Sequence, residues 1–519
     1  MKRHLLFFAL IYCCASITAS GPESLDTSFN GDGSLQATFS SGSTTIGFAI
    51  VMQDDGKILV GGQSGSSTSS FVARYNNDGS ADTTFNSSGT PGYIIATTIS
   101  SINGLAIQPD GKILVTGPGL SPYASQAVTI RYLSTGLIDT SFGTSGIVAT
   151  STMTTSNAIT LQDDGNIIIA GKNSSSGIIM RYTTDGVLDT TFGTSGSVAT
   201  AIGTSATASG VKLQTDGSIV ITGQTTISSV VNALVARYTT DGTLDTSFGT
   251  SGYVTTTLGN NAQTLGNALV IQDDQKIIVV GRTVPGSINY GFIMRLNTDG
   301  AFDTSFNSVG YTTGTSNTRY LGVTIQTNQQ TIACGSINSN TIIVTRYNTD
   351  GTVDSSCDIT ASDVSGTNNN AQDIVVQTDQ KIIISGSITT SSFNSGQNAL
   401  GIVRWLGGFT PSSGRTTTIN TYGYNSAYIS EFLYVDFYAT VISDTTARAA
   451  AIDAVNVIID SFATSYVNQS SFNFISYAYL MNEDLLAAEE LLASNYPSSS
   501  TEIAQFFEYI FARETQLLE

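Results

Sequence analysis

Short runs of apolar residues follow one another along most of the chain, and turns rich in Asp and Gly separate them. The segment 50–62, for example, reads IVMQDDGKILVGG. Two β-rich runs joined by Asp-Gly predict a β-hairpin, because Asp and Gly tolerate the positive φ that such a turn requires. A third run ends in Arg-Tyr, and a Gly-bearing corner leads to a fourth. Each unit is therefore predicted to contain four short strands.

The unit recurs seven times. A Gln closes the first run, a Gly stands nine residues later, and an Arg ends the third run. The Gln residues are Gln53, Gln108, Gln162, Gln214, Gln272, Gln326 and Gln377, and the Arg residues are Arg74, Arg131, Arg181, Arg237, Arg295, Arg346 and Arg404. The mean spacing of the Arg residues is (404 − 74)/6 = 55 residues. Seven copies of a four-stranded unit predict an all-β, seven-bladed β-propeller over residues 21–406.

A carboxylate stands eight residues after most of these arginines. The pairs are Arg74–Asp82, Arg131–Asp139, Arg181–Asp189, Arg237–Asp245, Arg295–Asp303 and Arg346–Asp354. A motif copied in every blade indicates a structural role, in which a charge-assisted hydrogen bond locks the outer strands. Two residues lack a partner at this spacing, Arg404 near the end of the repeats and Asp26 at their beginning. We therefore expect residues 24–40 to supply the outer strand of the last blade, with Asp26 paired to Arg404.

Two charges depart from the repeat and are the candidate ligand-binding residues. In each first strand the residues one and three before the Gln are apolar and are expected to pack between blades, whereas the other face carries mostly small residues near the axis. Lys212 and Asp373 place a charge on that small-residue face. Surface placement near a strand end is the structural alternative. Other departures are Gln275, Gln329 and Gln380 in place of a turn glycine and Cys357 in place of Phe, which indicate either function or drift.

The recurring words resemble a known family. LDTSFG together with QxDGKI and ARY is similar to the delta-60 repeat of secreted bacterial proteins, over about residues 25–406. The resemblance implies a β-propeller and export. It implies no agreed activity and no catalytic residues.

The pattern changes after Trp405. A Gly-, Ser- and Thr-rich linker is predicted over 407–425, and the apolar period then lengthens to that of helices. Residues 426–519 are therefore predicted to form a small all-α C-terminal domain of four amphipathic helices.

The first twenty residues have the features of a secretory signal peptide. Lys2 and Arg3 precede a short apolar run and a small-residue cleavage region before Gly21. We expect a secreted, periplasmic or cell-surface protein without a transmembrane segment in its mature chain. A lipid anchor on Cys13 or Cys14 is a less favoured alternative, because Tyr12 stands where a small residue is needed.

Composition excludes several classes of function. The mature chain would hold 20 − 2 = 18 Lys and Arg against 39 Asp and Glu, a formal net charge of −21, which opposes nucleic-acid binding. It would hold no histidine, because His4 lies in the signal peptide, so Ser-His-Asp catalysis and His-ligated metal sites are excluded. The Asn-x-Asp-Gly turns lack the carboxylates of a calcium loop, and no metal or cofactor is expected. Cys334 and Cys357 allow either a disulfide or two free thiols.

Three hypotheses about function follow. The first is an exported, monomeric, non-catalytic binding or surface-interaction scaffold with a protein or glycan partner. The second is a carboxylate-dependent enzyme, such as a glycan lyase or hydrolase, with its site at the propeller axis. The third places the interaction in the helical C-terminal domain.

Overall fold

The computed structural model describes residues 25–39, 44–65, 68–259, 263–338, 340–360, 369–389 and 398–406, together with the isolated positions 451, 492, 495 and 503. The chain divides into two compact units, Met1–Gly407 and Gly408–Glu519. The predicted signal peptide, linker and helices of the C-terminal domain lie outside the described ranges, so the all-α domain stays a prediction.

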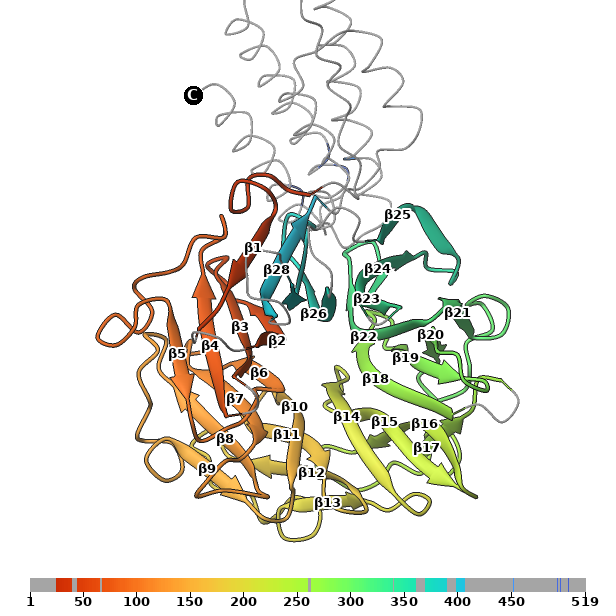
Figure 1. Cartoon of the computed structure of the whole chain (residues 1–519). Helices are drawn as coiled ribbons and strands as arrows, with labels where there is room; N and C mark the ends of the chain where they lie inside the picture. Colours follow the sequence, from red (N-terminus) through yellow and green to blue (C-terminus); the bar gives the residue numbers. More distant parts are fainter. Residues whose placement is uncertain are drawn as a thin grey trace, which may run out of the picture. The chain divides into compact units, whose positions relative to one another are not determined.

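Seven four-stranded antiparallel sheets form a seven-bladed propeller (Figure 1). Each sheet places its strands in chain order from the first strand outward, except in the last blade. The first strands of neighbouring blades lie against one another around the ring. In order of blades, the strands are β2 (Thr45–Met52), β3 (Ile58–Ser64), β4 (Ser69–Tyr75) and β5 (Tyr93–Ala96); β6 (Gly104–Ile107), β7 (Ile113–Pro118), β8 (Ala127–Tyr132) and β9 (Ile147–Thr150); β10 (Thr155–Leu161), β11 (Ile167–Lys172), β12 (Gly177–Tyr182) and β13 (Ser197–Thr200); β14 (Ala206–Leu213), β15 (Ile219–Ile227), β16 (Val230–Tyr238) and β17 (Tyr253–Thr256); β18 (Gln263–Ile271), β19 (Ile277–Val284), β20 (Tyr290–Leu296) and β21 (Tyr311–Ser316); β22 (Thr318–Ile325), β23 (Thr331–Ile337), β24 (Thr341–Tyr347) and β25 (Val353–Thr360); and β26 (Asn370–Val376), β27 (Ile382–Ile388), β28 (Ala399–Trp405) and β1 (Ser34–Ala37).

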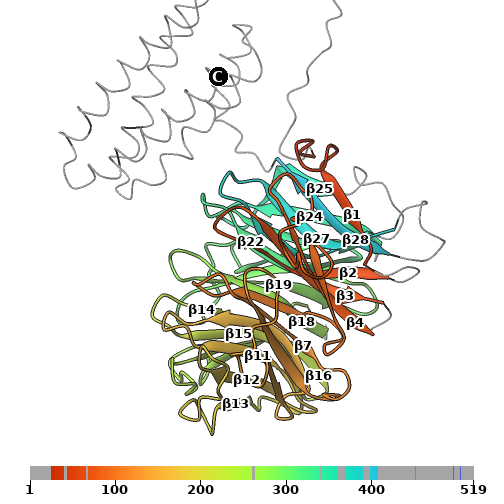
Figure 2. The same ribbon diagram turned by 90° about the vertical axis from the view of Figure 1, so that its left-hand side faces the viewer.

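The last blade joins the two ends of the propeller. Its outer strand is β1, which pairs antiparallel with β28 from Ser34 opposite Val403 to Ala37 opposite Leu400. Figure 2 shows β1 beside β28 from a second direction. Asp26 Oδ2 lies 2.8 Å from Arg404 Nη2, and the backbone N–H of Asp26 donates to the carbonyl of Arg404 at 2.9 Å. The N-terminal segment therefore covers a strand edge that would otherwise be open to intermolecular pairing.

The core lies between the blades, because each sheet presents β-branched and aliphatic residues to both neighbours. One cluster, for example, joins Ile168 and Ile179 of the third blade to Val211 and Ile221 of the fourth. Trp405, the single tryptophan, is fully buried in the cluster that joins the sixth and seventh blades.

The two sides of the ring differ in their turns. One side carries the turns between the first and second strands and between the third and fourth strands of each blade, and these turns contain the repeated Asp-Gly sequences. We call this side the Asp face. The opposite face is formed by the turns between the second and third strands and by the connections between blades.

The repeated arginines brace the Asp face. In all seven blades the guanidinium lies 2.7–2.9 Å from its carboxylate. In six of them Nη1 also donates to a backbone carbonyl in a turn of the following blade, as Arg131 does to Thr184. The same six guanidinium groups lie 4.7–4.8 Å from the centroid of a Phe ring. The sixth blade has Cys357 at this Phe position. In these six blades the motif thus ties one blade to the next.

The three glutamines that replace a turn glycine also connect blades. Gln275, Gln329 and Gln380 each adopt a φ of 65°, the left-handed region that the glycine of the other turns adopts freely. The side chain of each accepts a hydrogen bond from a backbone N–H in the turn of the preceding blade, as Gln275 does from Thr215 at 2.9 Å. These contacts between blades are a structural reason for the three substitutions of glycine by glutamine. The sequence analysis had considered only drift and function.

Candidate ligand site at the propeller axis

Most of the first strands carry a β-bulge, and the bulged residue lines the propeller axis. In six blades the register with the second strand shifts at one residue, which lies five positions before the repeated Gln. A bulge adds a residue that has no partner in the neighbouring strand and turns its side chain away from the regular alternation. Together with the equivalent residue of the second blade, the set is Phe48, Asn103, Asn157, Ser209, Asn267, Leu321 and Gln372. We call these seven residues the axial ring.

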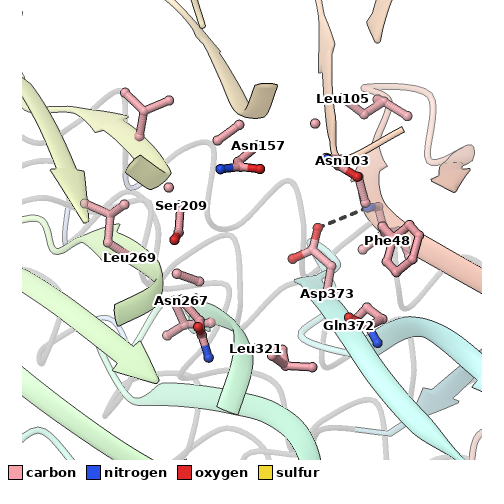
Figure 3. Close-up of a pocket in the computed structure, with 18 of the residues that line it drawn as sticks. Phe48, Asn103, Leu105, Asn157, Ser209, Asn267, Leu269, Leu321, Gln372 and Asp373 are labelled. Atoms are coloured by element: carbon pink, nitrogen blue, oxygen red, sulfur yellow. Dashed lines mark hydrogen bonds between the residues drawn. The ribbon is translucent and has the colours of Figure 1, made fainter. Parts of the chain in front are cut away.

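The axial ring lines a central cavity of about 910 Å³ (Figure 3). All seven first strands contribute to its wall, and Leu105 and Leu269 add apolar surface between the polar side chains. Small residues that the sequence predicted at the axis, such as Ala49 and Gly210, line the cavity. The larger residues at the bulge position were not predicted. Regular alternation from the Gln does not identify the bulge residue as axial, because the bulge reverses the faces to which the preceding side chains point.

Three asparagines of the axial ring hold neighbouring blades together. The side-chain nitrogen of Asn103 donates to the carbonyl of Ser156 at 3.0 Å, that of Asn157 to Ala208 at 2.8 Å, and that of Asn267 to Tyr320 at 2.7 Å. Each amide nitrogen is thereby committed to the fold. The amide oxygens of Asn157 and Asn267 remain as hydrogen-bond acceptors at the cavity wall.

Asp373 lines the cavity at the junction of the last and first blades. Its position, four residues before the Gln, holds Gly or Ala in every other blade: Ala49, Gly104, Ala158, Gly210, Ala268 and Gly322. In the second blade, a Cβ at this position would lie 3.1 Å from the backbone nitrogen of Ile159 in the next blade. In the last blade, the Asp373 carboxylate is likewise close to the backbone of the next blade. Oδ2 accepts from the N–H of Ile50 in the first blade at 3.1 Å, and Oδ1 accepts from the N–H of Ile374 at 2.9 Å.

The environment of Asp373 favours its neutral form. Protein surrounds the side chain while part of it faces the cavity, and this loss of hydration raises the pKa of Asp373 to about 6. The two backbone N–H groups and the positive charge of Lys212 act in the opposite direction and are outweighed. A carboxylate that is harder to ionise when folded, at a position where glycine suffices, is typical of a functional position.

Replacing Asp373 with Asn should remove a pH-dependent cost of folding. The folded-state pKa is raised, so the folded protein binds the proton more tightly than the unfolded chain between about pH 4 and pH 6. The contribution of Asp373 to stability is therefore greatest at low pH and declines as the pH rises toward 6. Asn removes the charge, but it keeps one of the two acceptor oxygens and turns the other into a donor that meets a backbone N–H. That cost is the same at both pH values, so the melting temperature of D373N relative to the wild type should be higher at pH 7.5 than at pH 4.5. Equal melting differences at both values would contradict the assignment.

Lys212 lines the same cavity from the fourth blade. It stands two residues before the Gln, where the other blades have Val51, Ala106, Thr160, Val270, Thr324 and Val375. Its side chain is exposed, and no carboxylate among the described residues lies within 4.0 Å of its Nζ. The structure therefore brings the two candidates, Lys212 and Asp373, to one cavity, whereas the seven Arg–Asp pairs lie outside its lining.

Other chemistry is limited in the described part of the chain. Those residues contain no group of three or more His, Cys, Asp or Glu side chains that could hold a metal ion. Cys334 is a free, buried thiol, and burial raises its pKa well above the usual value, so it is unreactive. A search of the same residues for helices that are long and apolar enough to cross a membrane finds none.

Six segments of the chain match a protein family described as "Domain of unknown function (DUF5122) beta-propeller". They are residues 53–85, 108–142, 162–192, 214–248, 272–306 and 331–356. The first five cover the turn between the first and second strands and then the second and third strands, and the sixth begins at the second strand. These matches place the chain among β-propeller repeat proteins. They do not bear on the narrower resemblance to the delta-60 repeat.

Several solved structures are similar to this chain at low identity. The polysaccharide lyase Uly1 is 11% identical, with 71% of this chain and 91% of that chain covered and a TM-score of 0.43. The α-L-arabinofuranosidase Arb93A from Fusarium graminearum is 11% identical, with 58% and 92% covered and a TM-score of 0.38. A protein of unknown function from Dyadobacter fermentans is 11% identical, with 72% and 98% covered and a TM-score of 0.38. No curated protein matches the sequence.

Proposed function

We propose that this β-propeller is a non-catalytic binding scaffold that holds a glycan ligand in its axial cavity. The observation that carries the proposal is the convergence of Lys212 and Asp373, the two charges that depart from the repeat, on one cavity of about 910 Å³. That volume lies in the range of small-molecule sites. Export to the periplasm, cell surface or medium as a monomer is part of the proposal, and a mature N-terminus at Gly21 would support it.

The lining suits a ligand rich in hydroxyl groups. The oxygens of Asn157 and Asn267 accept hydrogen bonds, Lys212 donates them, and the ring of Phe48 offers an apolar surface. Asp373 is held by two backbone N–H groups, so its carboxylate can accept a ligand hydroxyl without losing its position. Rigid polar groups lower the entropic cost of binding.

An enzyme is the alternative. Glycoside hydrolysis commonly uses two carboxylates about 5–9.5 Å apart. Among the described residues that line the cavity, Asp373 is the single carboxylate. This favours binding without turnover, although a lyase that uses one acid and one lysine would fit the same residues.

A glycan array with parallel assays for hydrolysis and elimination tests the proposal on the mature chain, residues 21–519. We expect binding without release of products. Lys212→Val restores the residue that Val51 and Val270 provide in other blades, so it should keep the fold and weaken binding at least tenfold. Lys57→Ala removes the same charge from the Asp face and should leave binding unchanged. Product release that D373N abolishes would instead establish the enzyme.

A further inference from the structure

The distribution of ion pairs sets four of the described cations apart from the others. The structure describes fifteen Lys and Arg residues, and eleven of them lie within 4.0 Å of a carboxylate. All eleven of these ion pairs lie on the Asp face. The four without such a partner among the described residues are Lys172, Lys212, Arg282 and Arg319. A cation without a carboxylate is unexpected in a protein with 39 acidic and 20 basic residues.

Three of these cations lie at the opposite face of the ring. Lys172 is the last residue of β11 and pairs across the sheet with Thr155, at the beginning of a first strand. Arg282 pairs with Leu265 near the beginning of β18, and Arg319 is the second residue of β22. All three therefore stand where the first strands begin, and Lys172 lines the axial cavity itself.

The opposite face also lacks negative charge in the part that the structure describes. Its turns and connections, such as 97–103, 119–126, 173–176 and 201–205, contain no Asp or Glu. The repeated Asp-Gly turns all lie on the Asp face. The described part of the propeller is consequently polarised along its axis: the Asp face is acidic, and the opposite face carries Lys172, Arg282 and Arg319, which we call the basic rim.

Arg282 and Arg319 lie close together, and no described carboxylate lies within 4.0 Å of either. Arg282 pairs with Gly291, whose N–H donates to the hydroxyl of Thr318 at 2.7 Å, and Thr318 precedes Arg319. The Nε of Arg319 donates to Ser336 Oγ at 2.8 Å, which fixes the guanidinium. Burial, and then the charge of Arg282, lower the pKa of Arg319. Two neighbouring guanidinium groups repel each other, and an anion between them would relieve that repulsion.

Asp373 shows that the inner strand edges accept a carboxylate. The N–H groups of Ile50 and Ile374 occupy the same position in two blades, three residues before the Gln, and both donate to this one side chain. Leu105, Ile159, Val211, Leu269 and Val323 hold that position in the other blades, with the same strand pairing. Their N–H groups offer further donors along the cavity wall.

We propose that the axial cavity takes an anionic glycan, with sugar-borne carboxylate or sulfate groups, which enters from the opposite face between Lys172, Arg282 and Arg319. The inference rests on the proposed glycan-binding function and adds the ligand's charge and direction. The acidic Asp face repels the ligand and the basic rim attracts it, so association is directed to one end of the channel. Lys212 meets the ligand near the far end, because it stands two residues from the Gln that ends the first strand.

The test measures the binding of oligosaccharides of equal length to the mature chain by calorimetry. The probes are an oligogalacturonate, a sulfated oligosaccharide and a neutral oligosaccharide, each at 50 and 500 mM NaCl, with single-stranded DNA as a further polyanion. We expect one of the acidic oligosaccharides to bind at least tenfold more tightly than the neutral one, with affinity that falls at high salt. The two acidic probes distinguish carboxylate from sulfate.

Substitutions to residues of sister blades remove the rim charges while keeping the fold. In other blades, the position of Lys172 and Arg282 is occupied by Gln63 and Gln224. The position of Arg319 is occupied by Thr155 and Thr207. The variant K172Q/R282Q/R319T should lose at least tenfold in affinity for the acidic probe, whereas Lys57→Ala and Lys112→Ala on the Asp face should lose none. If the neutral oligosaccharide binds as tightly as the acidic ones, the inference is overturned while glycan binding stands. If DNA binds as tightly as the acidic oligosaccharides, the inference is overturned as well. Absence of binding to every oligosaccharide would overturn the proposed function as well.

Discussion

Deletion of residues 21–40 should destabilise the propeller more than any single substitution. The deletion removes β1 from the edge of β28, the pair between Asp26 and Arg404, and the buried side chains of Phe29 and Leu35. Burial of those two side chains alone is worth about 3–6 kcal/mol. The exposed edge of β28 would also be available for pairing with another molecule. We expect a much lower melting temperature and concentration-dependent aggregation.

Removal of residues 420–519 provides the comparison for the deletion. That truncation leaves the seven blades and their closure intact, so the melting temperature of the propeller should change little. Thermal unfolding followed by circular dichroism in the β-sheet region measures both variants. Unchanged melting after deletion of residues 21–40 would contradict the contribution that we assign to the closing strand.

Arg404→Ala should have the largest effect among single substitutions at the closure. The guanidinium is 2% exposed, and it bonds Asp26, Ser28 and Gln377 while lying 4.8 Å from the Phe29 ring centroid. Its loss would leave the Asp26 carboxylate buried with Lys381, at 3.4 Å, as its remaining cation. Breaking one side of a buried pair costs about 3–5 kcal/mol, and Lys381 should hold the loss near about 3 kcal/mol. Chemical denaturation measures the difference.

Two comparisons separate this effect from a general loss of charge. Lys57→Ala breaks a pair whose side chains are 28% and 53% exposed, so its cost should stay within about 0.5 kcal/mol. The double variant Asp26→Ala/Arg404→Ala should recover part of the loss, because no buried carboxylate is then left with a weakened partner. A double variant that is destabilised by the sum of both single changes would show that the two residues do not interact.

The ring of blades was readable from the sequence because each structural contact repeats. Arg237, for instance, donates hydrogen bonds to Asp245 and to a carbonyl of the next blade, as most of its counterparts do. The repeated spacing of the motif therefore predicts the repeated contact. The closing strand was readable for the opposite reason. Asp26 and Arg404 each lacked a partner at the repeated spacing, and a closed ring offers each the other.

The axial cavity was readable only in part. Lys212 and Asp373 stood out as charges among small residues. The bulge residues did not, because the shift in register places Asn157 and its equivalents on a face that regular alternation assigns elsewhere. Lys172 and Arg282 follow the repeated Gly at a position that varies from blade to blade. Their common feature is that no carboxylate of the described residues lies within 4.0 Å, and it becomes visible only when the folded chain shows which cations are paired.

The closure of the last blade also sets the order in which the molecule can be completed. Asp26 can pair only after Arg404 has been synthesised, and Arg404 lies 404 − 26 = 378 residues later in the chain. At synthesis rates of about 5–20 residues per second, the N-terminal segment stays without its partner strand for about 20–75 s. Six blades can form while that segment waits, because each of them is built from consecutive strands. The seventh forms last, so a growing chain carries an unpaired N-terminal strand until the final repeat emerges.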